Sequence, residues 1–512
     1  MSLQSTESAA ADPTPGAAAS GDPATAGQPG RLAAGRLRVW DIVFFVVSAA
    51  APLTVVASSA PLAFSLGGIG AAGAMLVCGV VLILFAVGFT AMSQHVRNTG
   101  AFYAYVGRGL GKPAGVGIAF VTLFAYVALS VSFYGLIGAY TELTVSALLG
   151  IDVSWVVWAL VFALLIAVLG HRKVDVGAKV LAVLLTAEVG ILLLISIAVL
   201  VNGGPEPMGA ATFEPANILF AGGAGALFVL GFGAFIGFEG TAIYAEEAKD
   251  PARTIPKATY IAVAFLAVFY AFTFWILTVA FGEQGILAFA ATDDFMSMTF
   301  IAADGYLGGW AAVVVEVLII TSFFACLLAF HNASSRYMFS LGREGLLPAI
   351  VARTGERSRS PYVASAVIVA VAIVAILVFA LAGADPWLEL GMWTYAIGVS
   401  GVIFAQGVAA VAVVFFFAKD RRGHGWFRVV AAPALGAVGL IGAYLIIVLN
   451  FDVVSGLVGV ENLPMILPAP ALFIAGIVMG LVIKRREPAL YGRLAETLPE
   501  PDWSAEQPIK LS

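Results

Sequence analysis

The amino-acid sequence predicts an all-α integral membrane protein, and its composition and its apolar runs both lead to this fold class. Of the 512 residues 61% are hydrophobic and 11% are charged, whereas a soluble domain carries about 25% charged residues. The apolar residues come in runs of about 20, the length that a helix needs to cross a bilayer. Nothing in these runs alternates as the strands of a membrane barrel do.

Twelve apolar runs are long enough to cross a bilayer, so twelve transmembrane helices are expected. They cover residues 41–66, 71–92, 114–149, 153–170, 176–201, 217–245, 258–282, 308–332, 362–383, 387–417, 429–450 and 464–483. Together they predict one membrane domain over residues 39–486.

The segments outside the membrane domain are predicted to be tails. Residues 1–38 are expected to form a disordered cytoplasmic tail, because the first 30 contain no Lys or Arg and are rich in Ala, Ser, Thr, Pro and Gly. This composition is not that of a cleavable signal peptide. Residues 487–512 are expected to form a cytoplasmic C-terminal tail.

The positive charges predict the orientation of the chain. Of the 26 Lys and Arg, Lys179 lies at the start of the fifth span, and all others lie before the first span, after the last span or in the loops after even-numbered spans; the six opposite loops contain none. Because positive loops stay in the cytoplasm during insertion, both termini are expected to be cytoplasmic in a multi-pass protein of the inner membrane. The two signs of charge lie at opposite faces, so the net charge of -5 gives no reason to expect a nucleic-acid partner.

The first and sixth spans contain residues that interrupt helices. In span 1, Pro52 and Pro61 each lack a backbone donor, and span 6 is predicted to break at Gly231, Gly233 and Gly237. Backbone that leaves the helix inside hydrocarbon survives only where protein surrounds it or where it lines a cavity. Close packing of helices is the alternative reason for such residues.

Breaks five spans apart predict two inverted repeats. The repeats would cover about 41–201 and 217–417, followed by two additional helices within 429–483. The half-helix after a break exposes N–H groups and a positive dipole end that suit a carboxylate. Freed carbonyls of the preceding half suit an ammonium group or a cation, and an amino acid carries both charged groups.

Three motifs in this order resemble the amino acid/polyamine/organocation permease superfamily. They are NTGAFYAYVGRGLGKPAG at 98–115, FGAFIGFEG at 232–240 with AEEAKDPARTIPKA at 245–258, and HNASSRYMFSLGREGLLP at 331–348. The resemblance implies a transporter of amino acids or related amines that works by alternating access around helices 1 and 6.

The resemblance also places substrate contacts in span 6. Gly233, Ile236 and Glu239 match positions that contact the substrate or gate it, and Gly237 lies between them. Relatives often have an aromatic residue at the position of Gly233. Phe235 is expected to close over a substrate and to offer its ring to an amine.

Further substrate contacts are expected in spans 1, 3 and 8. In span 8 the resemblance places Phe330 over the substrate, and in span 3 it places Ser130 near a polar contact. Where relatives have a Gly-Ser-Gly-like break in span 1, this chain has a bulkier segment. Its candidate residues are Ala51, Pro52, Thr54, Val55 and Val56.

Ionisable residues within spans are candidates for gating or ion coupling, because they are costly there unless they have a partner. Glu239 and Glu188 head this group, with hydrogen bonding between helices as the alternative role for each. Tyr126 shares one helix face with Ser130 and Tyr134, and it is expected at the gate.

Charged residues on the cytoplasmic side are predicted to form salt bridges between loops that stabilise one state of the transport cycle. They are Glu246, Glu247, Lys249, Asp250, Arg253, Arg336, Arg343 and Glu344. A solvated loop is the alternative.

The function expected from the sequence is import of an amino acid or small amine in symport with H⁺ or Na⁺. Exchange of one such solute for another is the alternative within the same fold, and a transporter-like membrane receptor is a further one. The chain contains no GxSxG or HExxH motif and no cluster of His within the spans, so no enzyme activity, cofactor or metal is expected. The expected partners are a small-molecule substrate and the lipid bilayer, and the sequence leaves the oligomeric state open.

Overall fold

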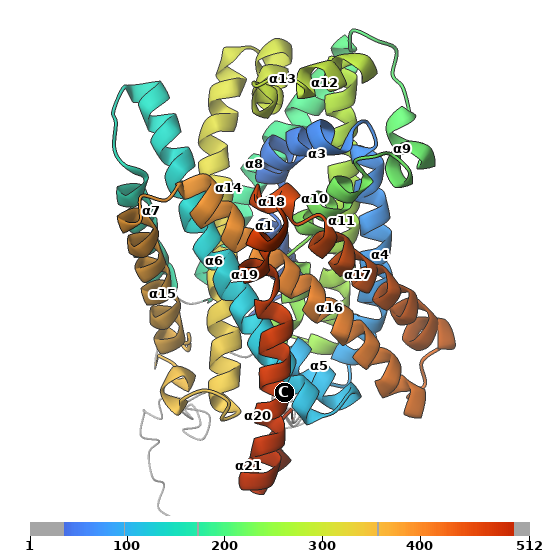
Figure 1. The fold of residues 1–512 in the computed structure, drawn as a ribbon, viewed down its shortest axis with the longest axis vertical. Coiled ribbons are helices and arrows are strands. Elements are labelled where there is room, and N and C mark those ends of the chain that lie inside the picture. The colour runs from blue at the N-terminus through green and yellow to red at the C-terminus, as the bar shows by residue number, and fades with distance from the viewer. Residues whose placement is uncertain (1–34, 97, 171–173, 356–357, 496–512) are drawn as a thin grey trace, which may run out of the picture.

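The computed structural model describes residues 35–96, 98–170, 174–355 and 358–495. These residues form a bundle of helices whose long members run along the longest axis (Figure 1). Within the described residues the strand-like pairing is limited to one isolated bridge between Leu37 and Ala248. The predicted all-α class is confirmed for this part of the chain.

The helices keep the order that the apolar runs predict. The α-helices are α1 Val39–Ala49, α2 Pro52–Thr54, α3 Ala60–Gly67, α4 Ala71–Ser93, α5 Phe102–Gly109, α6 Lys112–Leu149, α7 Trp155–Gly170, α8 Val174–Asn202, α9 Pro215–Leu219, α10 Ala224–Ala234, α11 Pro251–Phe281, α12 Glu283–Ala290, α13 Met298–Leu307, α14 Gly309–Arg343, α15 Tyr362–Leu381, α16 Thr394–Lys419, α17 Ala432–Leu449, α18 Asp452–Ser455, α19 Leu463–Ile466, α20 Pro468–Arg486 and α21 Pro488–Arg493. Short π-helical segments are η2 Val55–Ser59, η7 Pro386–Trp393 and η8 Phe427–Ala431. Short 3-10 segments are η3 Ala211–Phe213, η4 Phe238–Tyr244, η5 Phe295–Ser297, η6 Ala349–Ala352 and η9 Gly459–Asn462.

Eleven helices in the described part of the chain are long and apolar enough to cross a membrane. The remaining predicted span, 153–170, forms the shorter apolar helix α7 of 16 residues. The structure therefore supports a multi-pass membrane protein with eleven candidate spans.

The first span is discontinuous, and its break lies at Pro52, the first of the two prolines that the sequence singles out. Helix α1 ends at Ala49, and Ala51 has a left-handed φ of 46° before the chain turns into α2 at Pro52. Thr54, Val55 and Val56, where the resemblance places the break of relatives, are helical. Pro61 does not break the helix, because a π-helical turn precedes it in which the Ala60 N–H donates to the Val55 carbonyl five residues earlier.

The sixth span is also discontinuous, at the last of its three glycines. Helix α10 continues through Gly231 and Gly233 to Ala234, so the prediction of a break at these two glycines is wrong. The chain leaves the helix at Phe235, and Gly237 has a φ of 120° before η4 begins. A glycine is needed at this position because L side chains rarely adopt such a backbone conformation.

The two broken spans lie at the centre of the bundle. Helix α1 packs against α8, α11 and α14, and η4 lies beside α1 and α11. Of the most apolar part of span Ala224–Tyr244, 94% is buried within the protein, compared with 22% for Gly459–Arg486. The breaks are therefore shielded from lipid by the surrounding helices.

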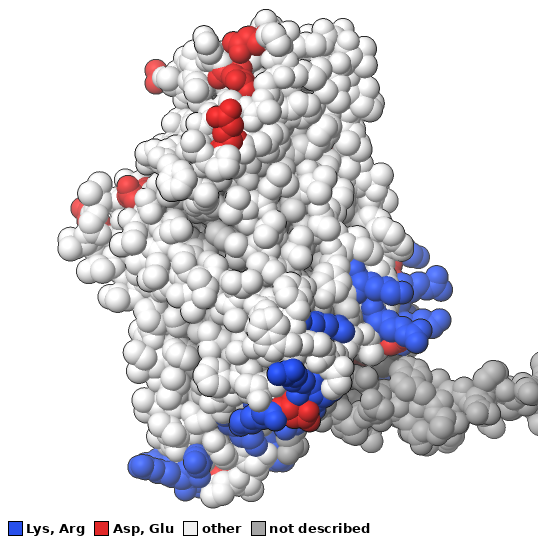
Figure 2. Space-filling model, turned by 90° about the vertical axis from the view of Figure 1, so that its right-hand side faces the viewer, with Lys and Arg blue, Asp and Glu red and all other residues white. Residues whose placement is uncertain are grey.

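Charged residues separate to opposite ends of the bundle. Figure 2 shows Asp and Glu at the upper end, Lys and Arg at the lower end, and an uncharged band between them. We call these the acidic end and the basic end. The acidic end includes α12 and α13 and the basic end includes α5 and α21 (Figure 1).

Short segments beyond the predicted membrane domain pack onto the basic end. The N–H groups of Arg36 and Leu37 donate to the Glu247 carbonyl at 2.9 and 3.0 Å, so ordered structure begins before residue 38, where the tail was expected to end. At the other terminus, the Ala495 N–H donates to the Tyr103 hydroxyl at 2.8 Å. The rest of both predicted tails, 1–34 and 496–512, lies outside the described residues.

Close packing of α4 and α17 gives a test of the fold. A Cβ added to Gly436 would lie 2.8 Å from the backbone N of Phe85, so we expect Gly436→Leu to destabilise the protein by about 1–3 kcal/mol through overpacking. The measurement is thermal unfolding in detergent. Gly442→Leu is the matched control on the same helix, because nothing lies within 4 Å of its added Cβ; equal melting temperatures for both variants would contradict the packing.

Candidate functional site

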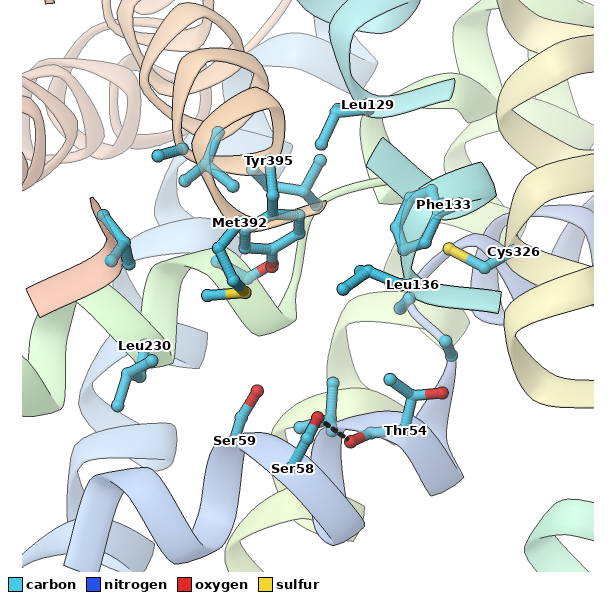
Figure 3. A pocket seen from close by; sticks show the side chains of 18 of the residues that line it. Thr54, Ser58, Ser59, Leu129, Phe133, Leu136, Leu230, Cys326, Met392 and Tyr395 are labelled. Carbon is cyan, nitrogen blue, oxygen red and sulfur yellow. Dashed lines mark hydrogen bonds between the residues drawn. The ribbon is translucent and has the colours of Figure 1, made fainter. Parts of the chain in front are cut away.

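A cavity of about 70 Å³ lies against both helix breaks. A water molecule needs at least about 10–15 Å³ by this measure, so the cavity has room for a small organic molecule. Figure 3 shows Thr54, Ser58 and Ser59 on one side of it. Met392 of η7 and Tyr395 of α16 face them from the other side. Spans 1 and 6 and helices α6, α14 and α16 supply most of the remaining wall.

The break in span 1 is stabilised by groups from three neighbouring helices. The Ala49 carbonyl accepts a hydrogen bond from the Cys326 thiol, and the Ala50 carbonyl accepts one from the Tyr270 hydroxyl, both at 2.8 Å. On the other side of the break, the Leu53 N–H donates to Glu188 Oε2 at 3.5 Å. Neighbouring side chains thus replace helical partners, as backbone at membrane depth requires.

Glu239 stabilises the break in span 6. Its Oε2 accepts the Gly237 N–H at 3.0 Å and the Gln406 amide at 3.2 Å, and its Oε1 accepts the Tyr126 hydroxyl at 3.2 Å. The Tyr395 hydroxyl donates to the Gly233 carbonyl at 3.2 Å. Helices α6 and α16 are thereby linked to the break.

The two breaks touch each other. A Cβ added to Gly237 would lie 2.6 Å from the Ala49 Cβ, at the end of α1. The left-handed φ and this close approach both require glycine here.

Six of the residues predicted to bind substrate line the cavity. They are Ala51, Thr54, Val55, Gly233, Ile236 and Phe330. Tyr126, Gly237 and Glu239 instead line a second, smaller cavity of about 10 Å³ on the side of the basic end, and Phe330 lines that one too.

The other four predicted contacts lie behind the wall of the cavity. Phe235 turns away from it and packs its ring edge-on against Tyr270, with 5.7 Å between ring centroids. Ser130 donates to the Tyr126 carbonyl at 2.9 Å, because a helical hydroxyl satisfies itself within its own helix. Pro52 and Val56 are buried and do not line the cavity.

Glu188 is connected to the cavity through two hydroxyl groups. Thr54, which lines the cavity, donates to the Ser322 hydroxyl at 3.0 Å, and Ser322 donates to Glu188 Oε2 at 2.7 Å. The Glu188 side chain is 1% exposed. A buried carboxylate therefore communicates with the cavity through hydrogen bonds.

Sequence reasoning missed several residues of the site, and Ser322, Cys326 and Gln406 are the clearest. Each lies within a mostly apolar stretch of a long helix, and its partner lies far away in the sequence. The one usable signal was polarity at membrane depth, which predicts a partner without naming it.

Phe330 separates the two cavities. Its ring stacks on Phe133, with 5.6 Å between centroids and 20° between planes, and it lies 6.2 Å from the Tyr126 ring. The route from the cavity toward the basic end is closed at this point.

Two ion pairs close the basic end, as the charge pattern predicts. Arg336 Nε lies 2.5 Å from Glu247 Oε2, with both side chains at most 3% exposed, and Arg343 Nη2 lies 2.6 Å from Glu246 Oε1. They join the end of α14 to the loop after η4. Burial alone would raise the pKa of Glu246, but the bonded Arg343 guanidinium holds it below its ordinary value.

Comparison with known protein families identifies the family of this chain. A family model described as amino acid permease matches residues 41–459. The chain belongs to the amino acid permease family. That range contains both helix breaks, both cavities and both ion pairs.

Individual relatives of this permease are distant. An uncharacterised amino acid permease, YecA of Bacillus subtilis, is 26% identical over 70% of this chain and 79% of its own length. The low-affinity putrescine importer PlaP of Escherichia coli is 22% identical over 73% of this chain and 81% of its own length. The branched-chain amino acid permease BcaP of Bacillus subtilis is 27% identical, but the match covers 30% of this chain and 32% of that protein.

The buried ion pair predicts a large loss of stability when one partner is removed. Arg336→Gln leaves the Glu247 carboxylate buried without its cation, so we expect the free energy of unfolding to fall by about 3–5 kcal/mol, measured by thermal unfolding in detergent.

Arg253→Gln is the control. The pair of Arg253 with Asp250, at 3.8 Å, is 81% and 53% exposed, and its loss should change stability by less than about 1 kcal/mol. A comparable, small effect of both substitutions would show that the Arg336–Glu247 pair does not close the basic end.

Proposed function

We propose that this permease imports a small amino acid or a related amine across the cytoplasmic membrane by alternating access, coupled to H⁺. The observation that carries the proposal is the cavity at two mutually touching helix breaks inside a membrane-spanning bundle. The names of the relatives, which include permeases for amino acids and a putrescine importer, support this substrate class. The proposal needs no cofactor and no enzymatic step.

The proposed topology has twelve spans, with α7 as the fourth, and an inverted repeat of five spans followed by two further helices. Breaks in the first and sixth spans support the repeat. The separation of charges supports placing the basic end and both termini in the cytoplasm. The acidic end then faces outward.

In this orientation the described state is closed to the cytoplasm. The Phe330 ring and the two ion pairs at the basic end lie between the cavity and the cytoplasm. We propose that α14, which carries Phe330, Arg336 and Arg343, moves away from the loop after η4 when the substrate is released. The ion pairs would re-form when the empty carrier returns.

We assign proton coupling to Glu188. Its carboxylate accepts from Leu53, at the start of the half-helix after the break, and from Ser322, which links it to Thr54 in the cavity. A proton on Glu188 would remove the charge that holds these donors. Its arrival or departure would therefore change the shape of the break beside the substrate.

The test is uptake into proteoliposomes of purified permease with a panel of labelled amino acids and polyamines, under imposed proton and sodium gradients separately. We expect an inward-directed proton gradient to drive accumulation of the substrate against its own concentration gradient. Accumulation driven only by sodium would overturn the assignment of the ion, and absence of transport for the whole panel would overturn the function.

Glu188→Gln should abolish accumulation driven by a proton gradient while counterflow of labelled substrate persists, because the glutamine keeps an acceptor oxygen but cannot take part in proton exchange. Glu316→Gln, on the same helix as Ser322 and outside this set of hydrogen bonds, is the matched control and should accumulate normally. Normal proton-driven accumulation by Glu188→Gln would refute the role of Glu188.

Glu239→Gln tests the second cavity. The substituted amide would present N–H groups toward the Gly237 N–H or the Gln406 amide, so we expect a transport rate reduced about tenfold with little change in KM, a loss of roughly 1.4 kcal/mol in barrier stabilisation. Initial rates as a function of substrate concentration measure this. A raised KM at unchanged maximal rate would instead make Glu239 a substrate contact.

A further inference from the structure

The cavity separates polar from apolar groups. Its aliphatic hydroxyl groups are those of Thr54, Ser58 and Ser59 beside the break in span 1, with the hydroxyl of Tyr395 bonded to the Gly233 carbonyl opposite. The oxygen of Ser59 points into the space (Figure 3). Among the described residues that line the cavity there is no Asp, Glu, Lys, Arg or His.

We infer that the substrate is an α-amino acid with an uncharged, apolar side chain, and that Tyr395, Met392 and Phe133 select it. This inference rests on the proposed function. The two charged groups that all α-amino acids share would lie at the helix breaks, where hydroxyl groups and backbone dipoles gather. The side chain would then extend between α6 and the start of α16.

The wall available to the side chain is apolar on every side. Leu129, Phe133 and Leu136 face it from α6, and Met392 and Val399 from η7 and α16. Tyr395 presents its ring, which stands edge-on to Phe133 at 6.3 Å between centroids. Such a surface favours hydrocarbon side chains.

A second charged group on the substrate would find no counter-ion here. The oxygens of Glu239 are bonded to Tyr126, Gln406 and the Gly237 N–H, in the other cavity beyond Phe330. Glu188 lies behind Ser322. A distal ammonium or carboxylate group would lose its hydration without compensation, which we expect to weaken apparent affinity by about 100-fold or more.

Tyr395 takes up the space that glycine leaves at position 233. A Cβ added to Gly233 would lie 3.1 Å from the Tyr395 hydroxyl oxygen. The tyrosine ring thus limits the length of the substrate side chain.

The experiment measures KM and maximal rate in proteoliposomes for valine, methionine, phenylalanine, lysine, putrescine and glutamate. The inference is supported if one or more of the apolar amino acids is transported and the three solutes with a charged end are at least about 100-fold weaker in apparent affinity. Preferred transport of lysine, putrescine or glutamate overturns it and leaves the proposed function standing. Absence of transport for every solute overturns both.

Substitutions in the wall of the cavity test which side chains select the substrate. Tyr395→Ala should lower the KM of phenylalanine relative to that of valine by about tenfold, whereas Tyr395→Phe keeps the ring and the ratio. Tyr444→Ala removes a tyrosine that lies outside the cavity, on α17, and should leave the ratio unchanged. Met392→Ala is a second variant on the same wall, expected to act in the same direction if Tyr395→Ala does not fold. An unchanged KM ratio in the folded variants overturns the assignment of these side chains.

Discussion

The requirement that every backbone group at membrane depth has a partner governs this structure. Two spans leave the helix where water is absent, and the freed groups are bonded by Cys326, Tyr270, Glu188 and Glu239. These four residues come from α14, α11, α8 and η4. The same bonds therefore hold the break open and fix its neighbours around it, so the cavity is a consequence of how the breaks are stabilised.

The same constraint explains why polar residues gather in an otherwise apolar core. A hydroxyl or carboxyl group buried among hydrocarbon is expensive unless it is bonded. Ser322 and Gln406 satisfy carboxylates, while Tyr395 satisfies a carbonyl of span 6. What remains on the cavity surface after these bonds form is mostly apolar, and the proposed selectivity for apolar side chains rests on this surface.

Eleven of the predicted spans and the separation of charges between the two ends of the bundle agree with the structure. Both follow from the sequence because a span needs about 20 apolar residues and because nearly all Lys and Arg lie outside the apolar runs. The sequence also singled out Glu239, which bonds the break in span 6, and the charged residues that form the ion pairs of Arg336 and Arg343. It indicated the break in span 1 at Pro52, but also an interruption at Pro61 that does not occur, because the π-helical turn that accommodates Pro61 depends on packing. The partners of the breaks could not be predicted, since Cys326 is 277 residues away from Ala49 and Tyr270 is 220 residues away from Ala50.

The contact between the chain end and α5 has a consequence for the order of assembly. The Ala495 N–H bonds the Tyr103 hydroxyl and a Glu344 carboxylate oxygen, and 392 residues separate Ala495 from Tyr103. During synthesis, α5 is made early, whereas Ala495 is made only after α20 has been translated. The contact of Ala495 with Tyr103 and Glu344 can therefore form only after α20 has been made, so this part of the basic end joins segments made early and late in translation.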